Sequence, residues 1–165
     1  MKALLNIYTA IFAAFVLIPL SCEPLEEIGD TPEIGFKSLD GPYLVQTEDS
    51  TTLIGAFLTF SFQDGNSDFG VDLGSKPADS INLYLIPFQK VDGIYDSVDF
   101  ELYGRKYTVK KDDKMGEPGQ PVKGEIEVLV TYLLKPPFDT LRYDFYILDR
   151  AFNKSNVEST SDIAY

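Results

Sequence analysis

Short oxygen-bearing side chains occupy alternate positions at the start of the segment from residue 64 to residue 72. They are Asp64, Asn66 and Asp68, and Asp72 follows four positions later. Calcium takes six to eight oxygen ligands, so this segment could supply part of a calcium site. Asp149 is the further ligand that we would expect. The competing interpretation, which we favour, is a turn between strands, because Asp, Asn and Gly satisfy their own backbone in turns.

The spacing of Asp64, Asn66 and Asp68 matches the start of an EF-hand calcium loop, but the residues that follow do not match. An EF-hand loop has glycine at its sixth position and glutamate at its twelfth. This chain has Phe69 and Ser75 at those positions. Calcium is the one cofactor that the residues suggest, and it would need ligands from other parts of the chain.

The chain of 165 residues contains no histidine. Histidine is the commonest general base and a frequent metal ligand, so its absence excludes Ser-His-Asp catalysis, Cys-His catalysis and any zinc site that depends on histidine. A pair of carboxylates could still act as acid and base, but nothing marks one pair among the 26 acidic residues. We therefore expect that the protein is not an enzyme.

Cys22, the only cysteine, directly follows an apolar segment. Lys2 gives this segment a positive start, residues 3–20 are almost wholly apolar, and the small Ser21 precedes the cysteine. These features are typical of a secretory signal peptide, which we assign to residues 1–21. A transmembrane helix, which needs about 20 apolar residues, is the alternative. The adjacent cysteine favours cleavage.

The residues from Ile18 to Cys22 resemble the bacterial lipobox, in which small residues precede a cysteine that is lipidated and becomes the new N-terminus. The lipobox usually has leucine three places before the cysteine, where this chain has Pro19. The resemblance implies a lipid anchor on Cys22, and two or more acyl chains hold a protein stably on a membrane. Cleavage by an ordinary signal peptidase, which would leave a free thiol, is the alternative.

Removal of residues 1–21 would leave 26 acidic residues and 13 basic residues, one fewer than the 14 of the whole chain, for a net charge of −13. This charge disfavours nucleic acid as a partner. Residues 22–40 are rich in acidic residues, proline and glycine and lack periodicity, so we expect a flexible tether ahead of a domain at residues 41–165. Acidic residues after the cysteine resemble the export signal of Bacteroidota surface lipoproteins, and a merely solvated linker is the alternative.

From about Tyr43 onward, alternation of apolar and polar residues predicts strands with one buried face. The predicted strands lie at residues 58–63, 81–85, 98–102, 107–109, 122–131 and 141–147, with a last short strand near Val157. Pro87 is expected to end the second of them. About seven antiparallel strands and no helical stripe predict an all-β fold, an immunoglobulin-like antiparallel β-sandwich. A small antiparallel barrel is the alternative.

The chain resembles a family of small Bacteroidota cell-envelope lipoproteins of unassigned function through two polar elements. The early element, F-x-D-G-x-x-D-x-G, matches Phe62, Asp64, Gly65, Asp68 and Gly70. The late element, D-R-A-x-N-x-S-N, matches Asp149, Arg150, Ala151, Asn153, Ser155 and Asn156. The resemblance covers roughly residues 53–163 and implies an immunoglobulin- or fibronectin-like fold. We expect the late element to be a structural hairpin, with Phe152 where related hairpins have glycine.

These features lead to an expectation about the protein's role. We expect a lipid-anchored, non-catalytic binding or assembly module of the outer membrane, exposed at the surface or facing the periplasm. Its partner would be a protein or glycan of the cell envelope. The alternative is a calcium-stabilised carbohydrate-binding module, in which exposed tyrosine and phenylalanine rings stack on sugars. We favour packing for those rings, because aromatic residues are common in strands.

Overall fold

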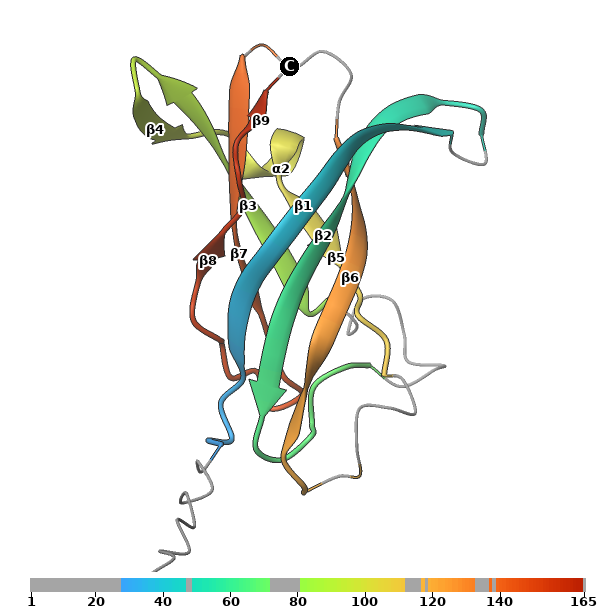
Figure 1. Ribbon diagram of the computed structural model, residues 1–165, viewed down its shortest axis with the longest axis vertical. Coiled ribbons are helices and arrows are strands. Elements are labelled where there is room, and N and C mark those ends of the chain that lie inside the picture. The colour runs from blue at the N-terminus through green and yellow to red at the C-terminus, as the bar shows by residue number, and fades with distance from the viewer. Residues whose placement is uncertain are drawn as a thin grey trace, which may run out of the picture.

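A computed structural model describes residues 28–46, 49–71, 81–111, 117, 119–132, 137 and 139–164. Two antiparallel sheets pack together (Figure 1), with the order β1-β2-β6 in one and β4-β3-β7-β8 in the other. The strands are β1 (Glu33–Gln46), β2 (Thr52–Asp64), β3 (Leu83–Val91), β4 (Ile94–Ser97), β5 (Arg105–Tyr107), β6 (Val122–Tyr132), β7 (Thr140–Ile147), β8 (Glu158–Ser159) and β9 (Ile163–Ala164), and the short helix is α2 (Phe100–Tyr103). The predicted all-β sandwich is confirmed.

The strand order is that of an immunoglobulin-like sandwich. In that fold, strands A, B and E share one sheet, and the other sheet contains C, F and G, with C′ beside C. Here β1, β2 and β6 take the places of A, B and E, and β4, β3, β7 and β8 take those of C′, C, F and G. Within the described residues, β5 and β9 are short additions that pair with β3 and β7.

The first strand begins earlier than the sequence predicts. A flexible tether is predicted through residue 40, but β1 starts at Glu33 and pairs with β2 along its length. The prediction is therefore wrong for residues 33–40, and the sandwich domain begins before residue 41. Ile34 and Phe36 pack inward, a register shift follows, and Leu39 is the next residue to pack on the core. This β-bulge breaks the two-residue period that marks a strand.

Pro87 does not end β3, which continues to Val91. On the side of β3 away from β7, pairing with β5 stops at Leu85 and pairing with β4 begins at Phe88. Pro87 thus lies between these two ladders, where no neighbouring strand needs the amide hydrogen that proline lacks. Its carbonyl oxygen still accepts a hydrogen bond from the Val98 amide at 3.2 Å.

The strand predicted at residues 98–102 is also wrong, because most of this segment belongs to α2. Asp99 caps the helix by accepting a hydrogen bond from the Glu101 amide at 2.9 Å, and Gly104 ends it. Leu102, which alternation places on a buried face, is 64% exposed. The alternation of apolar and polar residues in this segment therefore belongs to a short capped helix and not to a strand with one buried face.

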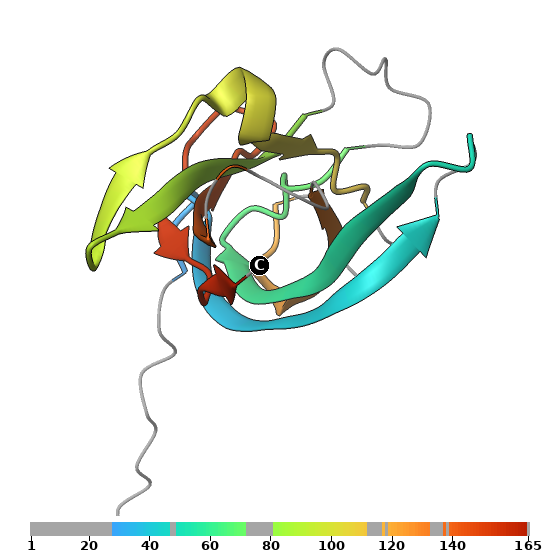
Figure 2. The ribbon, with the colours of Figure 1, turned by 90° about the horizontal axis from the view of Figure 1, so that it is seen from above.

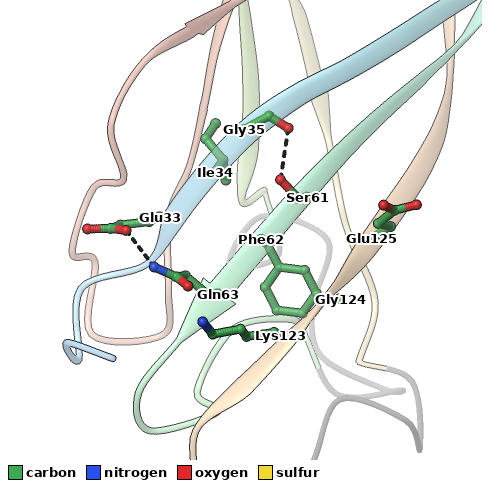
Figure 3. A pocket seen from close by; sticks show the side chains of 9 residues that line it. All are labelled: Glu33, Ile34, Gly35, Ser61, Phe62, Gln63, Lys123, Gly124 and Glu125. Carbon is green, nitrogen blue, oxygen red and sulfur yellow. Dashed lines mark hydrogen bonds between the residues drawn. The ribbon is translucent and has the colours of Figure 1, made fainter. Parts of the chain in front are cut away.

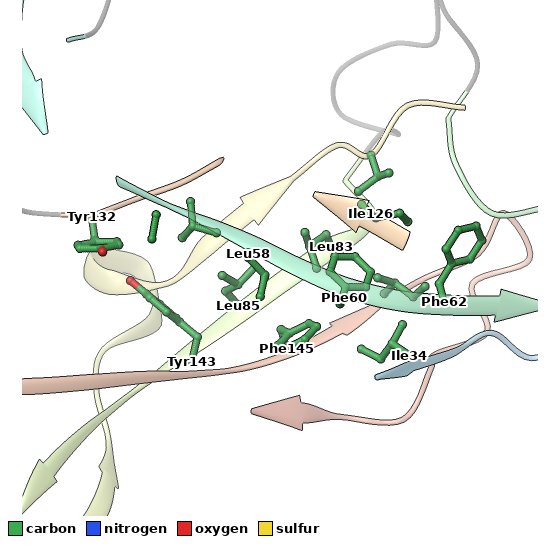
Figure 4. Close-up of a cluster of buried hydrophobic side chains, with 14 of the residues drawn as sticks. Ile34, Leu58, Phe60, Phe62, Leu83, Leu85, Ile126, Tyr132, Tyr143 and Phe145 are labelled. Atoms are coloured by element: carbon green, nitrogen blue, oxygen red, sulfur yellow. The ribbon is translucent and has the colours of Figure 1, made fainter. Parts of the chain in front are cut away.

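The buried apolar side chains of both sheets form a single cluster (Figure 4). Phe60 of β2 and Phe145 of β7 meet across the sandwich, with ring centroids 5.4 Å apart. Seen along the long axis, the blue-green pair of β1 and β2 curves around one side of the molecule, and β3 with α2 covers the other (Figure 2). A core of this extent can stabilise a domain of this size without disulfides.

Side chains close both seams between the two sheets. At one seam, Asn156 accepts a hydrogen bond from the Ile34 amide and donates one to the Ile34 carbonyl, each at 2.8 Å. At the other seam, Arg105 Nε donates to the Thr131 carbonyl at 2.6 Å, and the Thr131 amide donates to Tyr107 Oη at 3.0 Å. At the edges of β1 and β6, side chains therefore make backbone hydrogen bonds that a neighbouring strand would otherwise make.

Candidate functional site

The early polar element folds around the buried carboxylate of Asp64, the last residue of β2. One Asp64 oxygen accepts hydrogen bonds from the amides of Asp68 and Phe69, both at 3.1 Å, and the other accepts from Asn66 at 3.4 Å. Asn66 Oδ1 accepts a second hydrogen bond from the Asp68 amide at 3.0 Å. These contacts are those of the turn that we favoured.

The other residues of the early element also have structural roles. Phe62 packs against Phe69, with ring centroids 5.5 Å apart. The Gly65 amide donates to the Gly29 carbonyl at 2.9 Å, and a Cβ at Gly65 would collide with the carbonyl oxygens of Ile28 and Gly29. Gly65 therefore lets the residues ahead of β1 lie directly against the end of β2.

The late polar element forms the predicted structural hairpin after β7. Asp149 accepts hydrogen bonds from the Asn153 amide and from Asn153 Nδ2, both at 2.7 Å. Phe152 has φ of 65°, the left-handed conformation that glycine adopts easily. Ser155 Oγ accepts from the Ile147 amide at 3.0 Å. The hairpin keeps its glycine-like geometry although phenylalanine occupies the position.

The early and late elements dock against each other. The Arg150 amide donates to the Asp68 carbonyl at 3.3 Å, and Arg150 Nε donates to the Gly70 carbonyl at 2.9 Å. The structure thus places Asp149 next to the early element, as the sequence analysis expects. Burial, followed by the neighbouring carboxylates of Asp149 and Asp64, raises the pKa of Asp68 to about 6, against the lowering effect of Arg150.

The donor atoms at this junction do not fit calcium well. The oxygens of Asp64 and Asp149 already accept hydrogen bonds within their own turns, whereas the buried Asp68 Oδ1 has no hydrogen-bond partner among the described residues. Calcium needs six to eight oxygen ligands. No group of three or more acidic, cysteine or histidine residues in the described part of the chain is arranged to hold a metal ion. Asp72 lies outside the described residues.

A groove with a volume of about 460 Å³ lies on the three-stranded sheet, near the start of β1 (Figure 3). A Cβ on Gly35 would lie 2.8 Å from Ser61 Oγ, so this glycine leaves space in the groove, whereas a Cβ on Gly124 would face the core and lie 3.0 Å from the Phe62 ring. The groove is open to solvent and has charged residues on its rim, whereas pockets for small molecules usually enclose most of the ligand. It offers polar contacts but no group of catalytic residues.

Aromatic rings on the outer face of the larger sheet pack mainly against one another and against cations. Tyr84 and Tyr146 stack with their ring centroids 5.1 Å apart and their planes at 8°. Lys154 Nζ lies 4.0 Å from the centre of the Tyr146 ring, and the Arg142 guanidinium lies 3.8 Å from that of Tyr95. These ring faces are occupied within the protein, which agrees with the packing role that we favoured over sugar binding.

A group of exposed apolar residues, not predicted from the sequence, lies on the outer face of the β1-β2-β6 sheet. Tyr43, Phe57 and Leu129 are 50%, 38% and 36% exposed. The available signal was Phe57, because it lies between Ala56 and Leu58, which both point into the core. A single exposed apolar residue is ordinary, but several in contact on one outward face indicate an interaction surface.

A comparison with models of known protein families, with curated proteins and with solved structures finds no match for this chain. The fold therefore defines its class, an all-β sandwich with immunoglobulin-like strand order. Cys22 lies outside the described residues. Within the described ranges, no helix has the length and apolar character needed to cross a bilayer.

Proposed function

We propose that this chain is a lipid-anchored lipoprotein of the bacterial outer membrane or cell surface, and that its β-sandwich acts as a non-catalytic binding or assembly module. The observation that carries the proposal is the single cysteine, Cys22, directly after an apolar segment with a positive start. Lipidation explains a cysteine that cannot form an internal disulfide in a secreted protein.

The arrangement of the domain supports this proposal. β1 begins at one end of the sandwich, whereas the C-terminus lies at the other end (Figure 1). The 11 residues from Cys22 to Glu33 can span at most about 40 Å. A lipid on Cys22 would therefore hold the domain close to the membrane by the end where β1 begins. The polar junction of the early and late elements lies at that same end, and the opposite end would face away from the bilayer.

Mass spectrometry of the intact mature protein from its native membrane tests the anchor. The expected result is an N-terminus at Cys22 that carries acyl chains. Cys22→Ala should abolish the acylated N-terminus, whereas Ser21→Ala, which keeps a small residue before the cysteine, should retain it. A native protein that is water-soluble, starts at another residue or bears an unmodified thiol would show that the proposal is wrong.

The alternative, a calcium-stabilised carbohydrate-binding module, has one observation in its favour. Asp64, Asp68 and Asp149 lie close enough for their charges to raise the pKa of Asp68, and a cation would relieve this repulsion. A ligand that binds only the folded protein must raise its melting temperature. Thermal unfolding in calcium and in EDTA therefore separates the alternatives, because equal melting temperatures exclude calcium.

A further inference from the structure

Apolar side chains form a continuous area on the outer face of the β1-β2-β6 sheet, at the end farther from the start of β1. We call this area the distal patch, and its residues are Tyr43 and Val45 of β1, Leu53 and Phe57 of β2, and Leu129 of β6. About ten residues of β1 separate the patch from Glu33, which corresponds to about 30 Å at a rise of about 3.3 Å per residue. The patch therefore lies well away from the end where the chain enters the sandwich.

The register of the three strands shows that the distal patch is contiguous. Phe57 pairs with Leu129, and Val45 pairs with Leu53. The Tyr43 and Phe57 rings lie 6.0 Å apart. Val45 and Leu129 approach each other over Gly55, which has no side chain to separate them. A Cβ at Gly55 would lie 2.7 Å from Val45 Cγ2 and 3.0 Å from Leu129 Cδ1. Apolar residues that are contiguous rather than scattered indicate an interaction surface.

Among the described residues, two acidic residues border the distal patch on the outer face of the sheet. Asp40 pairs with Phe57 in the register of β1 and β2, and Glu127 lies two residues from Leu129, so both share the outer face with the patch. Both residues are exposed. Neither carboxylate forms an ion pair with another described residue; Asp40 accepts a hydrogen bond from the Ser38 hydroxyl at 2.9 Å. The surface therefore combines an apolar centre with a negative border.

The β1 edge of this sheet is a poorer docking site than the face of the sheet. The side chains of Asn156 and Glu158 already form hydrogen bonds with the backbone of β1 at Ile34 and Phe36. Farther along, Pro42 lacks an amide hydrogen, and the register of β1 shifts between Asp40 and Tyr43. Prolines and bulges of this kind prevent the addition of another strand. A partner is therefore expected on the face, through side chains.

Charge decides which occupant fits this face. The residues ahead of β1 include Glu26, Glu27 and Asp30, so this chain's own N-terminal segment would be repelled. A second copy would set acidic borders against each other in a chain whose net charge is −12. We propose that the distal patch docks a partner protein that presents apolar side chains bordered by lysine or arginine. This inference deepens the proposed binding role but does not depend on the lipid anchor.

Photocrosslinking with the full chain in its native cells tests the inference. Tyr43→p-benzoylphenylalanine places the reactive group in the patch, and Phe152→p-benzoylphenylalanine is the matched control, because Phe152 is an exposed aromatic residue on the hairpin after β7. The expected result is an adduct with one partner protein at position 43 and none at position 152. Mass spectrometry of the crosslinked peptide should show lysine or arginine next to the apolar crosslinked residue.

A charge reversal then tests the acidic border. Glu127→Lys should lower the yield of the adduct at position 43 by about tenfold, which is the scale of a lost charge complementarity of about 1.4 kcal/mol. Asp96→Lys, at an exposed aspartate of β4 on the other sheet, should leave the yield unchanged. An adduct insensitive to Glu127→Lys would overturn the inference.

The remaining outcomes also decide the question. An adduct with a second copy of this chain, an adduct with lipid, or equal labelling at positions 43 and 152 would each overturn the inference. Repeating the crosslink in the Cys22→Ala chain separates this proposal from that of the anchor. Loss of acylation with a retained adduct supports both proposals. Retained acylation with a retained adduct refutes the anchor on Cys22 alone.

Discussion

Replacing Asp68 by asparagine should stabilise the protein at neutral pH. Burial and the carboxylates of Asp149 and Asp64 raise the pKa of Asp68 from 3.8 to about 6, so its ionised form is unfavourable in the folded state. A full shift of this size corresponds to about 3 kcal/mol. Because the side chain is only partly buried, solvent screening should reduce the effect to about 1–2 kcal/mol. Asp68→Asn should raise the free energy of unfolding by that amount at pH 7.5.

The pH dependence follows from the direction of the shift. The folded state binds a proton at Asp68 more tightly than the unfolded chain, whose pKa is near 3.8. The destabilisation by Asp68 is therefore fully present above pH 6 and is relieved as the pH falls from about 6 toward 3.8. Over that window the unfolding free energy of the wild-type protein should rise relative to that of Asp68→Asn, and the two should converge near pH 4.

Urea unfolding at pH 7.5, 6.0, 5.0 and 4.5, in EDTA, measures this difference. Asp96→Asn is the control, since Asp96 is an exposed aspartate of β4 and its substitution should change little at any of these pH values. If Asp68→Asn lowered the free energy of unfolding at pH 7.5, the ionised carboxylate would be making a stabilising contact, and the reasoning would be refuted. A loss seen only when calcium replaces EDTA would favour the calcium alternative.

Three further substitutions test the structural roles of the polar elements. Phe152→Gly should stabilise the protein by about 0.5–1 kcal/mol in urea unfolding, because glycine accepts the left-handed backbone at φ of 65°, and Phe152→Ala should bring no such gain. Gly65→Ala should cost at least about 2 kcal/mol, because its Cβ would meet backbone carbonyls, whereas Gly29→Ala, with open space at that position, should be nearly neutral. Asn156→Ala should cost about 1–3 kcal/mol and speed hydrogen exchange at the Ile34 amide, and an unchanged exchange rate would contradict the proposed seam.

Alternation predicted the strands that bury one face and expose the other. In β7, Leu141, Tyr143 and Phe145 are buried, while the residues between them are only partly buried. β2 and β6 show the same pattern along most of their length. Because the side-chain period of a strand is two residues, a single buried face is enough to reveal such a strand in the sequence.

The residues that the sequence analysis could not place are those whose environment is set by distant parts of the chain. β1 was missed because a bulge separates Phe36 from Leu39, so its inward residues do not keep one period. Arg105 belongs to a local basic run, but its contact is the Thr131 carbonyl of another strand. No local pattern contains these pairings, because they arise only when the two sheets meet.

The residues of the two polar elements that the sequence predicts to lie together do so, but their types are compatible with two different roles. Asp64, Asp68 and Asp149 do meet, as a calcium site would require. Their hydrogen bonds nevertheless show that Asp64 and Asp149 organise turns. Turn formation and calcium binding use the same short oxygen-bearing side chains, so composition alone cannot separate them.

The two outer faces of the sandwich differ in a way that concerns function. On the larger sheet, Arg142 covers Tyr95 and Tyr146 stacks on Tyr84, so this face satisfies its own aromatic side chains. On the smaller sheet, Phe57 and Leu129 remain partly exposed and lie next to the exposed ring of Tyr43. The aromatic rings on the larger sheet are covered by contacts within the chain, whereas no described residue covers Phe57 and Leu129 on the smaller sheet. Apolar surface left in water costs free energy that burial by a partner would recover, so the smaller sheet is the face on which binding is expected.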